Sequence, residues 1–443
     1  MRLLYTVMLI TTVLGSCKKY LDEKPDQALS VPDNLDDLQM LLDDVRGINA
    51  GQTAPNSSSD EYYLKPADWE ALYQFDKDAY VWDPETDAHN DWVTFYRNIF
   101  TANTVLENLQ KVNREMDATR WDDLKGRALF IRGMCYFQLA QIFSPYYTGS
   151  ENSVYGLPLR LTSDFNQPVS RSTLKETWDQ LISDIQSSIP LLATTNQYKT
   201  QPSRWAANAL LARIYLLMGN YQKAYDHSDS CLAISSALLN YNQLNASLEY
   251  PINRLNSEVI YHMATDVPVT SFYWIARVDP TLYDLFASGD LRKKMFFIDN
   301  GDGSYSFRGN YTGEYILFTG LAIDEIYLTR AEAAVRLNKI TEALAGMNTL
   351  LKARWATGEF HESTITDPET LLKFILQERR KELMFRGLHW FDLRRLNTDP
   401  RFQQTLKRNI NGQVYSLPPN APRYVFLIPR KSVDFSNIPQ NPR

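Results

Sequence analysis

Apolar residues recur at helical spacing through most of the chain, with polar residues between them. Apolar side chains at positions i, i+3, i+4 and i+7 share one face of an α-helix, so the pattern predicts helices that each bury one face. The predicted helices are Leu35–Asp44, Trp92–Val112, Trp121–Phe143, Leu174–Leu192, Arg204–Met218, Tyr221–Ile234, Asp324–Leu337, Ile340–Trp355 and Pro368–Leu396. The predicted fold class is therefore mainly α.

The helical pattern is lost between Asn240 and Thr319, where Tyr, Phe, Pro and Gly are frequent. Alternating runs such as Glu258–His262 and Tyr305–Arg308 are typical of short strands. The Asn-Gly-Asp-Gly sequence within Asp299–Ser304 is typical of a hairpin turn. This part of the chain is predicted to form loops and short strands.

Small and aromatic residues repeat at fixed offsets in two of the predicted helix pairs. The first set is Ala212, Tyr215, Gly219, Tyr221, Ala224 and Cys231, and the second is Ala331, Ala334, Asn338, Ile340, Ala343 and Leu350. These offsets match the tetratricopeptide helix-turn-helix, in which small residues let two helices pack closely. Gly133, Tyr136 and Ala140 begin a weaker copy. We expect a tetratricopeptide-like scaffold of helix pairs, which must stack to bury their apolar faces.

The first sixteen residues have the layout of a targeting signal. Met1-Arg2 precedes an apolar run that ends at Leu14. Such a run spans about 18 Å as a helix, which is too short for a hydrocarbon core of about 30 Å. It ends in Leu14-Gly15-Ser16-Cys17, which resembles the lipobox of bacterial lipoproteins. We expect residues 1–16 to be a cleaved signal peptide and Cys17 to be lipidated; a soluble secretory signal and a buried helix are the alternatives.

Charge and cysteine content limit the partners and the redox chemistry to be expected. Lys and Arg number 46 and Asp and Glu 52, which gives a net charge of −6. Because duplex nucleic-acid binders are usually basic, no nucleic-acid partner is expected. Apart from Cys17, Cys135 and Cys231 lie in helical patterns among apolar residues. We expect two buried free thiols there, with a disulfide between them as the alternative.

The usual signatures of metal and enzyme chemistry do not occur in the chain. The five histidines lack zinc-ligand spacing, and no nucleophile elbow, Walker loop or dinucleotide-binding motif is found. The Asp299–Ser304 segment has glycine at the third and fifth ligand positions of a calcium loop. We expect no enzyme activity, no cofactor and no bound metal.

Several blocks along the chain resemble the SusD/RagB family, whose members are surface lipoproteins that capture nutrients beside a TonB-dependent outer-membrane channel. The blocks that carry the likeness are Arg127–Phe137, Pro145–Leu159, Ala209–Tyr215, Glu325–Ala333, Glu378–Arg395 and Phe426–Pro442. Together they cover nearly all of the chain after Cys17. Three positions depart from the family pattern: Ala322, Arg386 and His389, where the family often has Arg, Glu and Arg.

The most specific of these blocks is Glu378–Arg395, which we call the signature segment. Its charged residues include Glu378, Arg379, Glu382, Arg386, Asp392, Arg394 and Arg395. Residues four apart on a helix share a flank, so the spacing predicts ion pairs along one helix. Scaffold ion pairs are favoured over an active site.

The resemblance implies a function, a partner and a location. It implies an outer-membrane surface lipoprotein, facing the extracellular side, that binds an oligosaccharide and passes it to a SusC-like TonB-dependent transporter. The alternatives are a peptide-binding, RagB-like lipoprotein and an adaptor whose helical repeats bind only protein. The expected regions are 17–239 with helix pairs, and 240–443 with an insert at 240–319, helices at 324–396 and a tail at 397–443. Both regions are expected to pack as one globular unit.

Aromatic residues outside the helices are the candidate ligand contacts, because sugars stack on Tyr and Trp rings while polar groups bind their hydroxyls. The resemblance implies that ligands bind upstream of the first tetratricopeptide helix and in the irregular region. Tyr80, Trp82, Tyr273 and Trp274 are the predicted stacking residues, and Asn90 and Arg277 the predicted hydrogen-bonding residues. Tyr305, Tyr311 and Tyr315 form a further aromatic group. Packing in the core and contact with the transporter are the alternatives for each aromatic.

Overall fold

The computed structural model describes residues 32–149, 153–265 and 274–443. In this part of the chain the helices are α2 (Leu35–Leu42), α3 (Val45–Ile48), α4 (Ala54–Ser58), α5 (Pro66–Glu70), α6 (Gln74–Val81), α7 (His89–Leu109), α8 (Ala118–Phe143), α9 (Leu174–Ser188), α10 (Arg204–Leu217), α11 (Tyr221–Ile234), α12 (Pro280–Tyr283), α13 (Arg292–Phe296), α14 (Ile323–Arg336), α15 (Ile340–Lys352), α16 (Pro368–Glu382), α17 (Leu388–Leu396) and α18 (Arg430–Ser436). The predicted mainly α fold class is confirmed.

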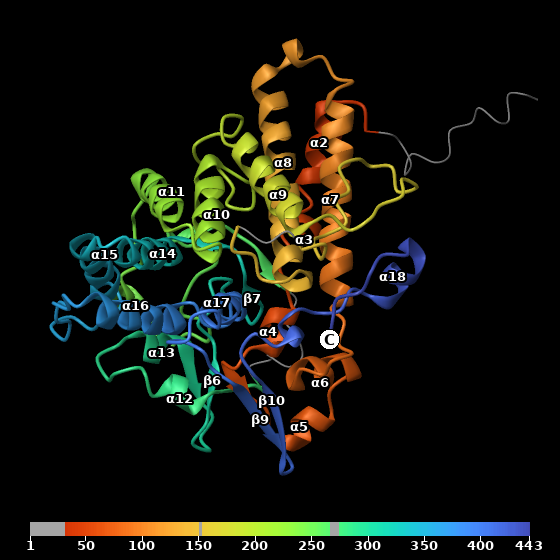
Figure 1. The fold of residues 1–443 in the computed structure, drawn as a ribbon. Helices are drawn as coiled ribbons and strands as arrows, with labels where there is room; N and C mark the ends of the chain where they lie inside the picture. Colours follow the sequence, from red (N-terminus) through yellow and green to blue (C-terminus); the bar gives the residue numbers. More distant parts are fainter. Residues whose placement is uncertain (1–31, 150–152, 266–273) are drawn as a thin grey trace, which may run out of the picture.

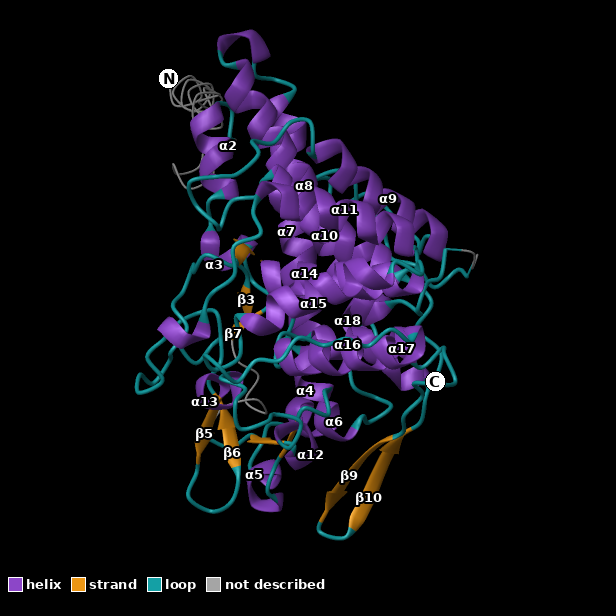
Figure 2. Ribbon diagram, turned by 90° about the vertical axis from the view of Figure 1, so that its left-hand side faces the viewer, coloured by secondary structure: helices purple, strands orange, loops and turns teal. Residues whose placement is uncertain are grey.

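The strands are short and form five two-stranded antiparallel sheets within the described residues. They are β1 (Tyr62–Tyr63), β2 (Val259–Tyr261), β3 (Ala264–Thr265), β4 (Arg277–Val278), β5 (Phe297–Asp299), β6 (Tyr305–Phe307), β7 (Leu317–Phe318), β8 (Leu321–Ala322), β9 (Leu406–Ile410) and β10 (Gln413–Leu417). The pairs are β1–β4, β2–β8, β3–β7, β5–β6 and β9–β10. Figure 2 shows them mostly below the helices, with the β5–β6 and β9–β10 hairpins at the end farthest from α2.

The helices pack as consecutive pairs that stack on one another (Figure 1). α8 packs against α7 and α9, α10 pairs with α11, and α14 pairs with α15. α11 also packs against α14, so the two predicted tetratricopeptide-like pairs are neighbours. At the α8–α9 crossing a Cβ on Gly133 would stand 2.9 Å from the Leu181 carbonyl oxygen, which only glycine avoids without a shift.

Side chains at the helix N-termini define where several helices begin. Thr173 and Glu176 form a capping box at the start of α9. Asp117 accepts a hydrogen bond from the backbone of α8, and Ser203 does so for α10. Such caps satisfy backbone N–H groups that lack a partner inside the helix.

The protein has two hydrophobic cores. The larger joins the helix pairs. The second lies beneath the irregular region and is rich in aromatics, including Phe296, Phe307, Phe318 and Phe385. Phe307 and Phe385 stack with ring centroids 4.6 Å apart. Many aromatics of the irregular region therefore fill a core of their own.

The structure corrects the predicted helix Pro368–Leu396, which is two helices. α16 ends at Glu382 and α17 begins at Leu388. Between them Phe385 and Gly387 have positive φ angles of 57° and 73°. The break turns Phe385 into the second core, where its burial offsets the cost of the left-handed backbone.

Three further features were not predicted from the hydrophobic pattern: the short helices between Ala54 and Val81, the β9–β10 hairpin, and α18. The predicted hairpin at Asp299–Ser304 is confirmed as the β5–β6 connection, with Gly301 and Gly303 at positive φ. Cys135 and Cys231 are confirmed as buried, free thiols. Cys17 and Tyr273 lie outside the described residues, within which no helix is both long and apolar enough to cross a bilayer.

Candidate ligand-binding site

Two segments predicted to carry ligand aromatics lie side by side. β1 pairs with β4, which places Tyr62 opposite Val278 and Tyr63 opposite Arg277. β1 leads into α5 and α6, at whose end Tyr80 and Trp82 lie, and Trp274 stands just before β4. The pairing therefore brings together two groups of residues that are about 200 positions apart in the chain.

The structure corrects the placement of Tyr80 and Trp82 as open stacking surfaces, because both are core residues. Tyr80 is 2% exposed and Trp82 3% exposed. The Tyr80 hydroxyl accepts a hydrogen bond from the Leu64 backbone, and Trp82 Nε1 donates to the Ser58 carbonyl, each at 2.9 Å. The Arg408 guanidinium lies 3.5 Å from the centre of the Tyr80 ring. Neither ring therefore offers a broad free face to a sugar.

Asn90 is exposed in the first turn of α7. Its neighbour Asp91 accepts hydrogen bonds from the backbone N–H groups of Thr53 and Ala54, at 2.8 and 2.9 Å, and so fixes the start of α4. Burial raises the pKa of Asp91 to about 6, against the effect of these hydrogen bonds. Among the described residues no hydrogen bond links Asn90 with the Trp274 segment, so the predicted polar and aromatic groups are not joined there.

Trp274 and Tyr315 form an exposed pair of rings, which we call the aromatic platform. Trp274 is 51% exposed and Tyr315 45% exposed, and their ring centroids are 6.2 Å apart at 51°. Arg277 Nη1 donates a hydrogen bond of 3.1 Å to the Trp274 carbonyl. Trp274 and Arg277 thus lie together, and Tyr315 joins them from the further aromatic group of Tyr305, Tyr311 and Tyr315. Gly313, with φ of 71°, turns the chain just before Tyr315.

A pocket of about 340 Å³, which we call the polar pocket, is lined in part by Tyr63, the strand partner of Arg277. Its charged lining comes from four segments: Asp60 before β1, Asp279 at the N-terminus of α12, Arg380 on α16, and Lys407 and Arg408 on β9. Tyr80 lines it as well, with its small exposed part. Arg408 Nη1 is buried and has no hydrogen-bond partner among the residues that the structure describes.

The acidic groups beside this pocket have opposite pKa shifts. Burial opposes ionisation of Asp60, but His389 at 2.6 Å, Arg380 at 3.1 Å and nearby Arg408 outweigh it and lower the pKa. Burial raises the pKa of its neighbour Glu61, whose carboxylate accepts from the Phe385 backbone at 3.0 Å. Asp60 is therefore the ionised group that holds His389 and Arg380 in place.

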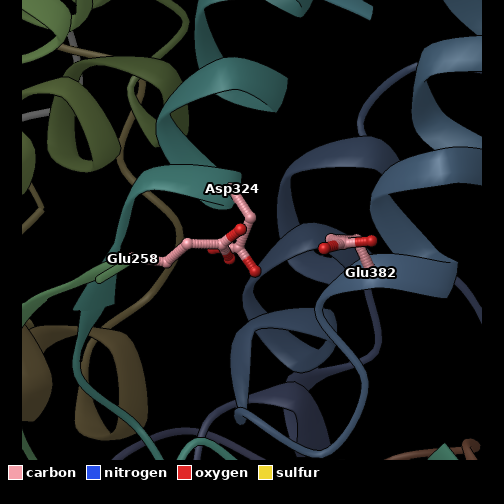
Figure 3. A group of neighbouring side chains, drawn as sticks. All are labelled: Glu258, Asp324 and Glu382. Atoms are coloured by element: carbon pink, nitrogen blue, oxygen red, sulfur yellow. The ribbon is translucent and has the colours of Figure 1, made fainter. Parts of the chain in front are cut away.

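The signature segment builds a buried ionic network with the irregular region. Glu258, Asp324 and Glu382 approach one another from three segments, as Figure 3 shows, with ligand atoms within 4.8 Å. Arg354 bonds Glu258 at 2.8 Å and Glu382 at 2.7 Å, and Arg386 bonds Asp324 at 2.7 Å. Most of these ion pairs are therefore buried and connect different elements, whereas Lys381–Glu378 and Arg395–Asp392 lie along one helix flank as predicted.

The donor set of this network does not fit a metal ion. Arginine N–H groups already occupy the carboxylate oxygens that a cation would need. With Asp290 and Glu378 the network holds five carboxylates, against the four cations Arg292, Arg354, Arg386 and Lys381. Burial raises the pKa of Glu258 to about 7, with Asp324 and Glu382 adding to the rise and Arg354 opposing it. One shared proton would balance the network.

Two of the positions that depart from the family pattern have partners of their own. Arg386 pairs with Asp324, and its guanidinium lies 4.3 Å from the centre of the Tyr311 ring. His389 pairs with Asp60 at the polar pocket. Ala322 is buried in β8 opposite Val259. Each of the three departures from the family pattern is therefore accommodated by a contact within this chain.

Two family models match the chain. One, described as "Starch-binding associating with outer membrane", matches residues 19–216, and the other, described as "SusD family", matches residues 298–437. Together they cover well over half of the sequence.

Curated relatives and solved structures agree with these matches. SusD-like protein P38 of Formosa agariphila is 22% identical over 89% of this chain and 90% of its own length. SusD-like protein P2 of the same organism is 23% identical over 69% of this chain and 71% of its own. The fold is similar to that of a SusD superfamily protein from Bacteroides thetaiotaomicron (TM-score 0.75, 22% identity, 93% of this chain and 100% of that one). It is also similar to a putative sugar binding protein from Bacteroides vulgatus (TM-score 0.74, 23% identity, 93% and 99%).

Proposed function

The chain belongs to the SusD/RagB family, and on that premise we propose that it is a lipid-anchored outer-membrane protein that binds an oligosaccharide and passes it to a SusC-like TonB-dependent transporter. The aromatic platform supports this proposal most directly. Trp274 and Tyr315 keep about half of their surface exposed, although large aromatics usually bury theirs. Such rings stack on the apolar faces of sugars.

The polar pocket supplies the hydrogen-bonding groups that a sugar needs next to a stacking surface. Arg277 bonds the Trp274 carbonyl and is the strand partner of Tyr63, and Tyr63 lines the pocket together with Arg380, Arg408 and Asp279. An oligosaccharide lying over Trp274 would extend one end toward these donors and acceptors. Contacts of this kind give modest affinity: a binding free energy of about −4 kcal/mol corresponds to a dissociation constant of about 1 mM. Such an affinity suits a protein that releases its ligand to a partner.

The lipid anchor is proposed at Cys17. Pro32, where the described chain begins, stands fifteen positions after it, and a stretch of that length reaches at most about 54 Å when extended. Figures 1 and 2 show α2, which follows Pro32, at the end of the molecule away from the β5–β6 and β9–β10 hairpins. An anchor at Cys17 would therefore join the protein at its helical end.

Binding is tested by affinity electrophoresis in gels that contain amylopectin, pullulan, xylan or laminarin, with a peptide pool as a separate arm. We expect retardation in at least one glycan gel, and a loss of about five- to tenfold in affinity for Trp274→Ala and for Tyr315→Ala, equivalent to about 1–1.5 kcal/mol. The matched control is Tyr73→Ala, because Tyr73 is 78% exposed and lies outside the platform.

The two arms decide between the candidate ligands. Wild-type protein that binds peptides and none of the glycans would replace the oligosaccharide with a peptide. Unchanged glycan affinity in both platform variants would remove the platform from the proposal.

The transporter partner is tested by a pull-down from detergent-solubilised outer membrane. We expect it to recover a large β-barrel, and repeated recovery of none would contradict the proposed transporter. Cys17→Ala is expected to release the protein from the membrane fraction.

A further inference from the structure

Arg394 differs from the other arginines of the signature segment, because it has no carboxylate partner among the described residues. Arg379 bonds Asp392 at 2.7 Å, and Arg395 bonds Glu332 at 2.6 Å. Arg394 is equally buried, with 4% of its surface exposed, yet within the described residues it donates only to two backbone carbonyls, those of Gln141 and Ser144. These carbonyls belong to the C-terminal end of α8, where a cation is favourable.

Capping α8 uses only part of the hydrogen-bonding capacity of Arg394. A guanidinium has five N–H donors, and Arg394 uses two of them within the described part of the chain. Arg171 is the instructive comparison, since it too is buried without a carboxylate. It makes five hydrogen bonds, to Gly156, Pro439, Asn441, Phe143 and Tyr155. All five N–H groups of Arg171 thus have a partner, whereas three N–H groups of Arg394 have none among the described residues.

Arg394 lines a pocket of about 280 Å³ that is separate from the polar pocket, and we call it the Arg394 pocket. Its lining residues are Pro145, Tyr146, Arg394, Asn397, Asn420, Ala421, Pro422, Tyr424, Val425 and Pro442. None of these described side chains is acidic. The volume corresponds to about nine water molecules at ~30 Å³ each, so it admits a small organic molecule but no oligomer.

Two further buried polar groups line the same pocket. The Tyr424 hydroxyl lies within reach of the Asn397 side chain, and among the described residues neither this hydroxyl nor Asn397 Nδ2 has any other hydrogen-bond partner. Asn397 is 1% exposed and Tyr424 4% exposed. Buried polar atoms are nearly always hydrogen-bonded in native proteins, so such atoms beside an unsaturated cation indicate a ligand.

The helix geometry explains why these groups meet. Trp390, Arg394 and Asn397 are spaced i, i+4 and i+7 along α17 and its end, so they share one face. The Trp390 ring lies 4.9 Å from the Tyr424 ring, which holds Tyr424 against this face. The cation, the amide and the phenol therefore converge from a rigid support.

The charge of Arg394 persists at neutral pH. Burial lowers its pKa to about 10, with the Tyr146 phenol opposing the change, and this is still well above 7. A buried charge that lacks a counter-charge is costly, and an anion in the pocket would offset that cost.

We infer that the Arg394 pocket binds the carboxylate group of a small organic anion. A carboxylate matches the flat fork of a guanidinium and accepts from several N–H groups at once. The amide of Asn397 and the hydroxyl of Tyr424 complete the donor set. This site is independent of the aromatic platform, so the failure of either leaves the other standing.

The inference is tested by saturation-transfer NMR with acetate and with D-glucuronate, at constant ionic strength, with D-glucose as the neutral probe. We expect saturable binding of both carboxylates in the millimolar range and none of D-glucose. Asn397→Asp places a carboxylate beside Arg394 with almost no change of shape, and is expected to weaken binding at least tenfold. Asn166→Asp is the matched control, because it adds the same charge at an exposed position and is expected to change nothing.

Tyr424→Phe gives a second test that does not depend on Asn397→Asp folding. It keeps the ring that packs on Trp390 and removes only the hydroxyl, so we expect a loss of about threefold in carboxylate affinity with the circular dichroism spectrum unchanged. Absence of saturable binding in the wild type would overturn the inference, and so would wild-type affinity in Asn397→Asp and Tyr424→Phe alike. Sulfate that competes as well as acetate would overturn the assignment to a carboxylate.

Discussion

Replacing Glu382 by Gln tests whether the buried ionic network holds the irregular region onto the helices. Glu382 is almost fully buried, and its two oxygens accept from Arg354 at 2.7 Å and from Arg292 at 2.9 Å. Glutamine has nearly the same shape, but it removes the charge and turns an NH₂ group toward one of the two guanidinium groups. Arg354 would keep Glu258, and Arg292 would keep Asp290 and Glu378.

The size of the effect follows from the burial of the pairs. Removing one partner of a buried ion pair costs about 3–5 kcal/mol. The network holds one carboxylate more than its cations, so the cost of Glu382→Gln comes from the acceptors that Arg354 and Arg292 lose and from the NH₂ group placed against a guanidinium. The matched control lies on the same helix: Glu369 pairs with Lys373 at 2.8 Å, with side chains 51% and 58% exposed. Exposed ion pairs contribute about 0–1 kcal/mol to stability, so Glu369→Gln is expected to lower the free energy of unfolding by less than about 1 kcal/mol.

The assay is equilibrium unfolding in urea, followed by tryptophan fluorescence and by circular dichroism, for the wild type and both variants. We expect Glu382→Gln to lower the unfolding free energy by several times the change in Glu369→Gln. The double variant Glu382→Gln with Arg354→Met should lose less than the sum of the two single losses, because the two residues share one interaction. Equal losses for Glu382→Gln and Glu369→Gln would refute the structural role of the network.

Three other changes give distinct outcomes. The pKa of Glu258 in the folded state is raised to about 7, so above pH 4.5 the folded state binds more protons than the unfolded state. The free energy of unfolding should therefore fall as the pH rises toward 7. Glu258→Gln should flatten this dependence in urea titrations at pH 5.5 and 8. Gly387→Ala should cost about 1–2 kcal/mol in the same assay, because φ is 73° and the new Cβ would lie 2.7 Å from Gln52 Nε2; an unchanged midpoint would contradict this. Trp82→Ala should cost about 3–5 kcal/mol in thermal or urea unfolding, whereas Trp274→Ala should cost under 1 kcal/mol, and equal losses would show that the burial contrast is wrong.

Local sequence signals account for much of the helical frame. The pairs α10–α11 and α14–α15 follow from apolar spacing together with small residues at fixed offsets. The β9–β10 hairpin also carried a local signal, Asn411-Gly412, whose φ angles of 50° and 85° fit a tight turn. The helical pattern of Pro368–Leu396 was misleading because Phe385 leaves the helix for a second core formed by residues distant in sequence.

The candidate site depended more on tertiary structure. Tyr80, Trp82 and Trp274 all stand outside the long helices and look alike in the sequence, but Arg408 from β9 covers the first two and leaves Trp274 open. Tyr315 meets Trp274 only because the chain turns at Gly313 and returns to it. Exposure of an aromatic is set by what packs on it from elsewhere, which periodicity does not encode.

The amino-acid sequence by itself determined the helix pairs, the hairpin turns and the family, because each depends on spacing within a few turns or on motifs read along the chain. The tertiary structure decided which charged residues pair. Arg394 and Arg395 are neighbours in one motif, yet within the described residues Arg395 meets the Glu332 carboxylate and Arg394 meets only backbone carbonyls. Helical spacing fixes the face on which a side chain stands. Its partner is fixed by the neighbouring segments that fold against that face.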